Sequence, residues 1–181
     1  MKVSEIIYEI KKHFDVLSID EKNEKYAQIE INEKDLRNVL LHCKHNMNFI
    51  HLSAISSVDY IKDNKFSLVY NLFSYKESIL LGIKILINRE KAEIATINDI
   101  YHPAIFFERD IHEMLGINFI GNNHLEKFIL DEWDGPPPMR KDFDTLEYVN
   151  DTFDWYEYDP EWAKKLGIKK EDLAGEEMEI L

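Results

Sequence analysis

Apolar residues recur at helical intervals in two stretches of the first quarter of the chain. The first set is Val3, Ile6, Ile7, Ile10 and Phe14, and the second is Leu36, Val39, Leu40, Cys43 and Met47. Residues three and four apart lie on one face of a helix, so each set predicts an amphipathic helix with one buried side. Between them, residues 16–19 and 26–31 alternate enough to favour two short strands.

From residue 48 onward the apolar period changes to two. Runs over residues 50–60, 66–72 and 79–87 alternate in polarity, and Asp63-Asn64 is typical of a hairpin turn. The turns are short, so these strands are expected to pair antiparallel, because a parallel crossover needs about a dozen residues or more. The pattern therefore predicts an α+β fold, a two-layer domain with a largely antiparallel sheet packed by helices and followed by an extended C-terminal tail.

Residues that interrupt or end helices, Pro103 and Gly116, mark the part of the chain that follows the predicted strands. A helix is expected from near Ile97, with an interruption at His102-Pro103, because the residue before a proline avoids helical geometry. A new helix should follow, and Gly116 is placed to end it in the left-handed conformation. Beyond Gly121 we expect an irregular chain with short helices at residues 125–128 and 160–167. This gives an α+β domain over residues 1–121 and an extended partner-clasping arm with an acidic aromatic tail over residues 122–181.

Charge and composition narrow the classes of function. The chain has 181 residues, 45% of them hydrophobic, and a net charge of −13, which argues against nucleic acid as a partner. Residues 144–181 hold 12 acidic and 4 basic residues. Residues 1–14 are too charged for a secretory signal, and the longest apolar run, residues 79–87, is far shorter than the ~20 residues of a membrane-spanning helix. Any membrane association is therefore expected to come through a partner.

The residues that could carry chemistry are few. Cys43 is the only cysteine, which excludes an internal disulfide, a cysteine-ligated iron–sulfur cluster and the cysteine pairs of a nickel–iron site in this chain. No phosphate-binding loop, dinucleotide fingerprint or nucleophile elbow is visible. Glu108 and His112 share a helix face, and we favour a surface ion pair over a metal site. We expect no catalytic, cofactor-binding or metal-binding residue.

The aromatic content of the last part of the chain and the charged segment at residues 140–143 point instead to a protein interface. The stretch after the last predicted strand is rich in aromatic residues, namely Trp133, Phe143, Tyr148, Phe153, Trp155, Tyr156, Tyr158 and Trp162. Aromatic residues and Arg are enriched at interface cores, so we favour a partner-binding segment over a solvated loop. Residues 140–143 are expected to make few contacts within the domain. Arg109, among acidic neighbours, fits equally an internal salt bridge and a bridge to a partner.

The segment from Glu108 to Phe143 resembles the signature of the thirty-kilodalton subunit family of respiratory complex I, the C subunit of NADH–quinone oxidoreductase. That pattern runs roughly E-R-E, two residues, D-M-F-G-I, one residue, F, one residue, G-H-P-D-L-R-R-I-L, then W, a Gly-Pro turn and R-K-D-F. The matching positions are Glu108-Arg109-Asp110, residues 113–117, Phe119, Gly121, Leu125, Trp133, Gly135, Pro138 and Arg140-Lys141-Asp142-Phe143. The family's His-Pro-Asp is replaced by Asn122-Asn123-His124, and its Arg-Arg by Glu126-Lys127.

The resemblance implies a non-catalytic structural subunit in the hydrophilic arm of a membrane-bound, ion-translocating redox complex. It implies a large partner resembling the forty-nine-kilodalton subunit of complex I or the [NiFe]-hydrogenase large subunit. It also implies iron–sulfur partner subunits that hold the clusters (and nickel–iron where present), and an indirect link to the membrane arm. The expected location is the cytoplasmic side of the membrane, held there by partners. The interface residues expected from the motif and the aromatic tail are Glu108, Arg109, Asp110, Trp133, Pro137, Arg140, Lys141, Asp142, Phe143 and Trp155.

Three functional alternatives follow. The divergent tail favours a subunit of a membrane-bound [NiFe] hydrogenase or of a ferredoxin-linked oxidoreductase. The C subunit of an NADH/quinone oxidoreductase is the second interpretation. A stand-alone acidic adaptor or soluble enzyme is the third, from another class.

Overall fold

The computed structural model describes residues 2–130, 132–152 and 165–167, and it divides the chain into two compact units. The first unit runs from Met1 to Phe143 and contains the sheet and three helices; the second is Asp144–Leu181, whose described part includes α4 (Thr145–Thr152). The boundary therefore lies later than the position after Gly121 that the sequence predicts. The reason is that residues 122–143 pack back onto the domain through contacts described below.

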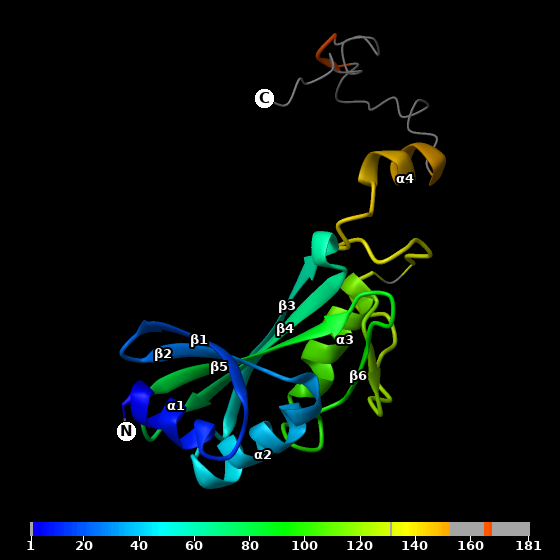
Figure 1. Cartoon of the computed structure of the whole chain (residues 1–181). Helices are drawn as coiled ribbons and strands as arrows, with labels where there is room; N and C mark the ends of the chain where they lie inside the picture. The colour runs from blue at the N-terminus through cyan, green and yellow to red at the C-terminus, as the bar shows by residue number, and fades with distance from the viewer. Residues whose placement is uncertain (1, 131, 153–164, 168–181) are drawn as a thin grey trace. The chain divides into compact units, whose positions relative to one another are not determined.

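Five strands form the main sheet in the spatial order β1-β2-β5-β4-β3 (Figure 1). Their bounds are β1 Val16–Asn23, β2 Tyr26–Ile31, β3 His51–Tyr60, β4 Lys65–Ser74 and β5 Ile79–Asn88. All neighbours pair antiparallel except β2 and β5, which run parallel with Ile29 opposite Ile83. The largely antiparallel sheet is confirmed, and the parallel pair is possible because α2 and the β3–β4 hairpin separate β2 from β5 along the chain.

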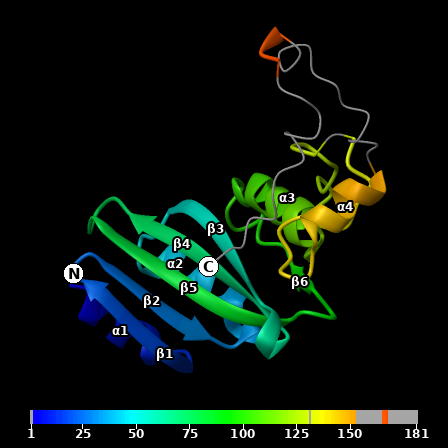
Figure 2. The same ribbon diagram turned by 90° about the horizontal axis from the view of Figure 1, so that it is seen from above.

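The sheet buries one face against helices. On β4 and β5 the buried residues alternate, with Phe66 opposite Ile87, Leu68 opposite Ile85 and so on along the pair. They share one core cluster with the apolar faces of α1 (Val3–Lys11), α2 (Leu36–Asn46) and α3 (Ala104–Leu115). In Figure 2 the α1 and α2 ribbons lie behind the strands, on the same side of the sheet. The two-layer α+β architecture is therefore confirmed.

Short elements link these layers. The 3-10 helix η1 (Glu33–Asp35) precedes α2, and the 3-10 helix η2 (Ile61–Asp63) connects β3 to β4. Asn64 closes the second connection in the left-handed conformation, with φ 52°, as the Asp63-Asn64 hairpin signal predicts. A two-stranded parallel ladder joins β6 (Glu93–Ala95) to β7 (Asn118–Ile120) on either side of α3.

Several local predictions were wrong. No helix forms from Ile97, where residues 98–100 make a turn, whereas α3 begins at Ala104 directly after Pro103, as expected. Residues 125–128 form bends without a helix, and α4 was not expected. The predicted tail helix over residues 160–167 falls mostly outside the described residues. Across the described part of the chain, every helix falls short of the length and apolar character that crossing a bilayer requires.

Cys43 lies on the buried face of α2. Its side chain is enclosed by the core, and that burial raises the pKa of its thiol to about 12. A thiol with such a pKa stays protonated at neutral pH, so Cys43 is a small core residue, as its position in the apolar pattern predicts.

Candidate partner-binding site

α3 carries several of the motif residues. Ala104, Glu108, Ile111 and Leu115 are buried at intervals of three and four, so the helix turns one side inward. Arg109 and Glu113 lie outside this buried set. Gly116 ends the helix with φ 73°, in the left-handed conformation predicted for it, and its N–H donates to the His112 carbonyl at 2.8 Å.

Glu108 faces inward and organises the start of this region. Its carboxylate accepts hydrogen bonds from the Thr96 hydroxyl at 2.5 Å, the Ile97 N–H at 2.9 Å and the Asn122 amide at 2.9 Å. Burial raises the pKa of Glu108, and these three donors oppose that rise. The side chain is fully enclosed by its own domain, which corrects its predicted place at a partner interface.

The ion pair expected between Glu108 and His112 does not form. His112 Nδ1 donates instead to the Ile117 carbonyl at 2.9 Å, just past the end of the helix. The two residues therefore differ in role despite their helical spacing. One is bonded into the core, and the other is bonded to the turn that follows the helix.

Arg109 and Glu113 hold the arm, residues 122–143, against α3. Arg109 donates from Nε to the Glu126 carbonyl at 2.7 Å and from Nη2 to the Lys127 carbonyl at 2.9 Å. Its guanidinium also lies 4.6 Å from the centre of the Phe128 ring. Arg109 thus has internal partners, and these are mainly backbone carbonyls, with the Glu126 carboxylate farther away at 3.7 Å.

Glu113 binds the N–H groups of the same loop. Its carboxylate accepts from the backbone of Phe128 at 3.0 Å, Ile129 at 3.1 Å and Leu130 at 2.6 Å. Burial alone would raise the pKa of Glu113, but the three backbone donors outweigh it and hold the pKa below its usual value. A charged carboxylate that gathers three N–H groups fixes the loop strongly, because charge-assisted hydrogen bonds are about twice as strong as neutral ones.

The end of the arm is fixed to the sheet. Arg89, which directly follows β5, bonds Asp59 of β3 through two contacts at 2.8 and 3.0 Å, and bonds Asp142 at 2.6 Å. Asp59 also accepts the Lys141 N–H at 2.9 Å. Residues 140–143 therefore have more internal contacts than the sequence led us to expect.

The network shifts the acidity of both carboxyls. Burial alone would raise the pKa of Asp59, but Arg89 and the Lys141 N–H reverse the effect and lower it. The Arg89 guanidinium lowers the pKa of Asp142. Both groups are therefore held as carboxylates, and the charged contacts persist at neutral pH.

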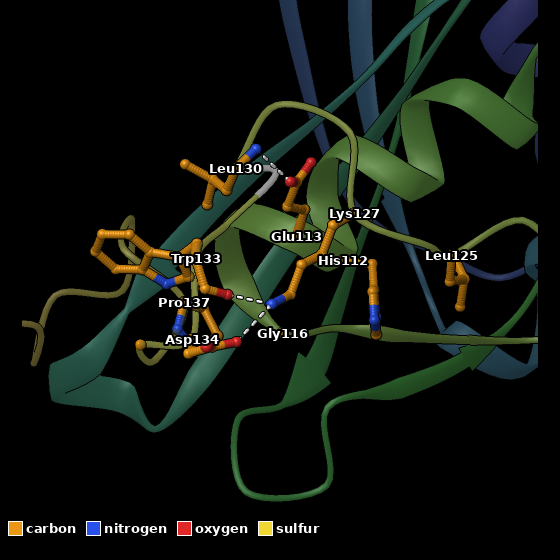
Figure 3. Close-up of a pocket in the computed structure, with 10 residues that line it drawn as sticks. His112, Glu113, Gly116, Leu125, Lys127, Leu130, Trp133, Asp134 and Pro137 are labelled. Atoms are coloured by element: carbon orange, nitrogen blue, oxygen red, sulfur yellow. Dashed lines mark hydrogen bonds and ion pairs between the residues drawn. The ribbon is translucent and has the colours of Figure 1, made fainter.

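A cavity of about 430 Å³ lies between the end of α3 and the folded-back arm (Figure 3). Its lining includes Leu125, Leu130, Trp133 and Pro137, together with the charged side chains of Glu113 and Lys127. Lys127 donates to the Trp133 carbonyl and bonds Asp134 at 3.2 Å. Pro137 lies against Gly116, where an added Cβ would meet its Cγ at 2.9 Å.

The structure brings most of the predicted site residues together, but their contacts are internal, whereas the sequence predicted contacts with a partner. Arg109 and residues 140–142 link the arm to the rest of the domain, and Pro137 lies against Gly116. Trp133 makes its contacts within the arm and packs edge-on to Phe143 with 5.7 Å between ring centroids. Asp110 is half-buried, and burial raises its pKa. Trp155 lies outside the described residues. Whether the exposed members bind a partner stays a prediction.

Sequence reasoning missed the apolar residues that the arm exposes. Phe128 and Ile129 are 67% and 58% exposed, and Met139 is 63% exposed. They are visible in the sequence as apolar residues in an irregular, charged segment, but they carry no periodicity. Within the described residues, no three His, Cys, Asp or Glu side chains gather into a metal site. The charged groups here bind backbone, so this arrangement is suited to holding the arm in one conformation.

The geometry defines a small α+β domain whose motif charges hold an arm against it, and comparison with known proteins gives its class. The family profile of the respiratory-chain NADH dehydrogenase 30 kDa subunit matches residues 29–149. The chain therefore belongs to the complex I 30 kDa subunit family, which confirms the resemblance found in the sequence.

Individual relatives agree. The chain is 30% identical over 115 residues to the C subunit of the F(420)H(2) dehydrogenase of Methanosarcina mazei, covering 63% of this chain and 73% of that protein. It is 32% identical over 129 residues to the C subunit of the NADH-quinone oxidoreductase of Rickettsia felis, covering 70% of this chain but only 58% of that longer protein. A Bdellovibrio bacteriovorus relative, 33% identical over 64% of this chain and 21% of its own length, is a C/D subunit of an NADH-quinone oxidoreductase.

Solved structures extend the likeness to the fold. A chain of the membrane-bound sulfane sulfur reductase, an archaeal respiratory membrane complex, matches with a TM-score of 0.76 and 30% identity, covering 87% of this chain and 95% of that chain. A trypsin-resistant fragment of Nqo5 matches with a TM-score of 0.57 and 21% identity over 66% of this chain and 96% of the fragment, which supports the fold alone. The relatives are thus subunits of complex I-related membrane complexes.

Proposed function

We propose that this chain is a non-catalytic structural subunit of a complex I-related, membrane-bound, ion-translocating redox complex. The observation that carries the proposal is the family match over residues 29–149, together with motif charges that bind backbone instead of lining a reaction site. The chain itself holds no cofactor in this proposal, because its one cysteine is a buried core residue. Iron–sulfur clusters, and nickel–iron where present, belong to partner subunits.

The partner we propose is the large subunit of the complex, called here the D-type subunit. The C/D subunit of Bdellovibrio bacteriovorus supports this choice, since its name joins C and D in one chain and our chain matches about a fifth of it. A covalent link between two subunits keeps them together at high effective concentration, which suits subunits that pack against each other. In this proposal the other subunits hold this chain at the cytoplasmic side of the membrane.

Within this class we favour a ferredoxin-linked or hydrogenase-type complex over a quinone reductase. The 30% identity and TM-score of 0.76 to the archaeal sulfane sulfur reductase chain support a relative outside the quinone reductases. The Asn122-Asn123-His124 replacement of the His-Pro-Asp motif adds to this. The C subunit of an NADH-quinone oxidoreductase is the alternative, favoured by the Rickettsia felis match.

Affinity purification of the tagged chain from its own cells tests the proposal. The expected result is co-purification of a D-type large subunit with iron–sulfur subunits from solubilised membranes, while the chain expressed alone carries no metal or flavin. A large subunit with two cysteine pairs would assign the hydrogenase type. Recovery of the chain alone from cells, or stoichiometric iron or flavin in the isolated chain, would contradict the proposal.

A further inference from the structure

Phe128 and Ile129 form an exposed apolar pair on an otherwise charged arm. They are 67% and 58% exposed, while the neighbouring Leu130 is half-buried beside the cavity under the arm. Single exposed apolar residues are normal on a protein surface. Two adjacent ones held in a fixed loop are different, because aromatic and large apolar side chains that enter a partner's pocket carry much of the binding energy of an interface.

The loop that carries this pair is fixed through both its N–H groups and its carbonyls. Glu113 accepts the N–H groups of residues 128, 129 and 130, and Arg109 donates to the carbonyls of residues 126 and 127. The backbone is thereby ordered before any partner arrives. Association then loses less conformational entropy, which favours affinity.

The sequence on either side of the pair is acidic. Residues 126–134 contain four acidic residues and one lysine, and that Lys127 is already bonded to Asp134. The side chains of Glu126 and Asp134 are 59% and 99% exposed. A partner surface that fits this loop therefore has an apolar pocket surrounded by Lys or Arg, because complementary charge at the rim favours encounter and register.

We infer that Phe128 and Ile129 form a preorganised apolar knob that inserts into an apolar, basic-rimmed pocket of the D-type large subunit, with Arg109 and Glu113 as its positioning residues. The inference rests on the proposed function, which supplies the partner. The inference names the residues that touch this partner. It also gives Arg109 and Glu113 a role, which is to hold the loop that presents Phe128 and Ile129.

Site-specific cross-linking identifies the contact. A photoreactive phenylalanine analogue at position 128 of the full chain, in the assembled complex, is expected to cross-link to the large subunit at a segment with apolar residues flanked by Lys or Arg. The same analogue at Tyr8, which is 65% exposed on α1, is the matched control and should leave the large subunit unlabelled. Cross-linking from position 128 to an iron–sulfur subunit, or to no protein, would overturn the assignment.

Substitution measures the strength of the contact. Phe128→Ser with Ile129→Ser should weaken binding to the co-expressed large subunit at least about tenfold, while the melting temperature of the free chain falls only slightly, through the lost contact of the Phe128 ring with Arg109. Tyr8→Ser with Leu17→Ser removes two similarly exposed apolar residues elsewhere and should leave binding unchanged. If the Phe128→Ser, Ile129→Ser variant binds as tightly as the unsubstituted chain, this inference alone is overturned. Failure of the unsubstituted chain to bind the large subunit would overturn the proposed function as well.

The positioning role has its own readout. Glu113→Ala should release the amide protons of residues 128–130 to hydrogen exchange and weaken binding several-fold, with Phe128 and Ile129 still present. Glu113→Gln keeps one acceptor oxygen and should restore part of both properties. Fast exchange with unchanged affinity would show that the knob needs no preorganisation and would remove the positioning role.

Discussion

The two halves of the first compact unit are held together by different interactions. Residues 3–88 bury alternating apolar side chains between a sheet and two helices, and the larger of these, such as Phe66 and Leu68, are wholly enclosed. Residues 93–143 include a fully buried carboxylate and an arm whose backbone is bound by Arg109, Glu113 and Asp59. The first half is organised by burial, whereas the second adds to its share of the buried core a set of charged side chains that satisfy backbone groups.

This difference determines how each half responds to change. Burial is spread over many contacts and has no direction, so its loss scales with the volume removed. A charge bonded to backbone is directional and concentrated, and its loss leaves buried N–H groups without an acceptor. The second half is therefore the more sensitive to substitutions that keep the volume and remove the charge.

The largest expected effects compare one residue from each half. Leu68→Ala, in the middle of β4, should lower the free energy of unfolding by roughly 2–5 kcal/mol through lost burial and the cavity it leaves. Glu108→Ala should cost roughly 2–3 kcal/mol, because the Ile97 N–H and the Asn122 amide lose their acceptor. Urea denaturation of both variants measures these values.

Hydrogen exchange separates the two mechanisms. Glu108→Ala, unlike Leu68→Ala, should selectively expose the Ile97 amide proton. Glu108→Gln, which keeps the volume, should show part of this effect. If Glu108→Gln were as stable as the unsubstituted chain, the contrast between burial and charge would be lost.

A smaller effect is expected where a backbone constraint joins α3 to the arm. Gly116→Val should cost roughly 1–2 kcal/mol, because a β-branched residue is strained at φ 73° and its Cβ would approach Pro137 Cγ at 2.9 Å. Gly116→Asn tolerates the left-handed conformation but keeps the contact, so it isolates the crowding against Pro137. The melting temperature measures both, and an unchanged value for the valine variant would mean that the helix can end in another geometry.

The smallest expected effect is a local response to acid. Asp59 and Asp142 have folded-state pKa values below their usual value of 3.8, so folding favours their charged forms. Their contribution is present above about pH 4 and is lost as the pH falls below 3.8 through the lowered values. The Lys141 amide, bonded to Asp59, should then lose protection from exchange.

The Met139 amide is the control for this acid response, because it bonds the Met114 carbonyl at 3.0 Å and has no carboxylate acceptor in that contact. Its exchange should change little over the same pH range. Equal responses of the Met139 and Lys141 amides would mean that the arm opens as a unit for another reason.

Sequence periodicity was sufficient for the half that burial organises. The alternation over residues 66–72 and 79–87 predicts β4 and β5, and the intervals among Val3, Ile6 and Ile10 predict α1, because a repeating burial pattern leaves a repeating sequence. The parallel pairing of β2 with β5 leaves no repeating pattern in the sequence, because it depends on which strands, distant along the chain, become neighbours in the sheet.

The arm could not be predicted in the same way. Glu113 meets N–H groups 15 to 17 residues away and Asp59 meets the Lys141 N–H 82 residues away, so no local interval indicates either contact. The motif identifies the right segment, but it suggests that the charges contact a partner. Their observed bonds run largely to backbone groups within the same domain.

The parallel pair also constrains the order in which the chain can fold. β3, β4 and β5 are joined by short turns, whereas α2, β3 and β4 all lie between Ile29 and its partner Ile83 along the chain. Closing a longer loop loses more chain entropy, and distant pairings form slowly for that reason. We expect the β3–β4–β5 meander to form first as a template and the β1–β2 hairpin to add to its free edge at the end. Pulse-labelled hydrogen exchange would resolve that sequence of events, and on the ribosome β2 must wait until β5 has been synthesised.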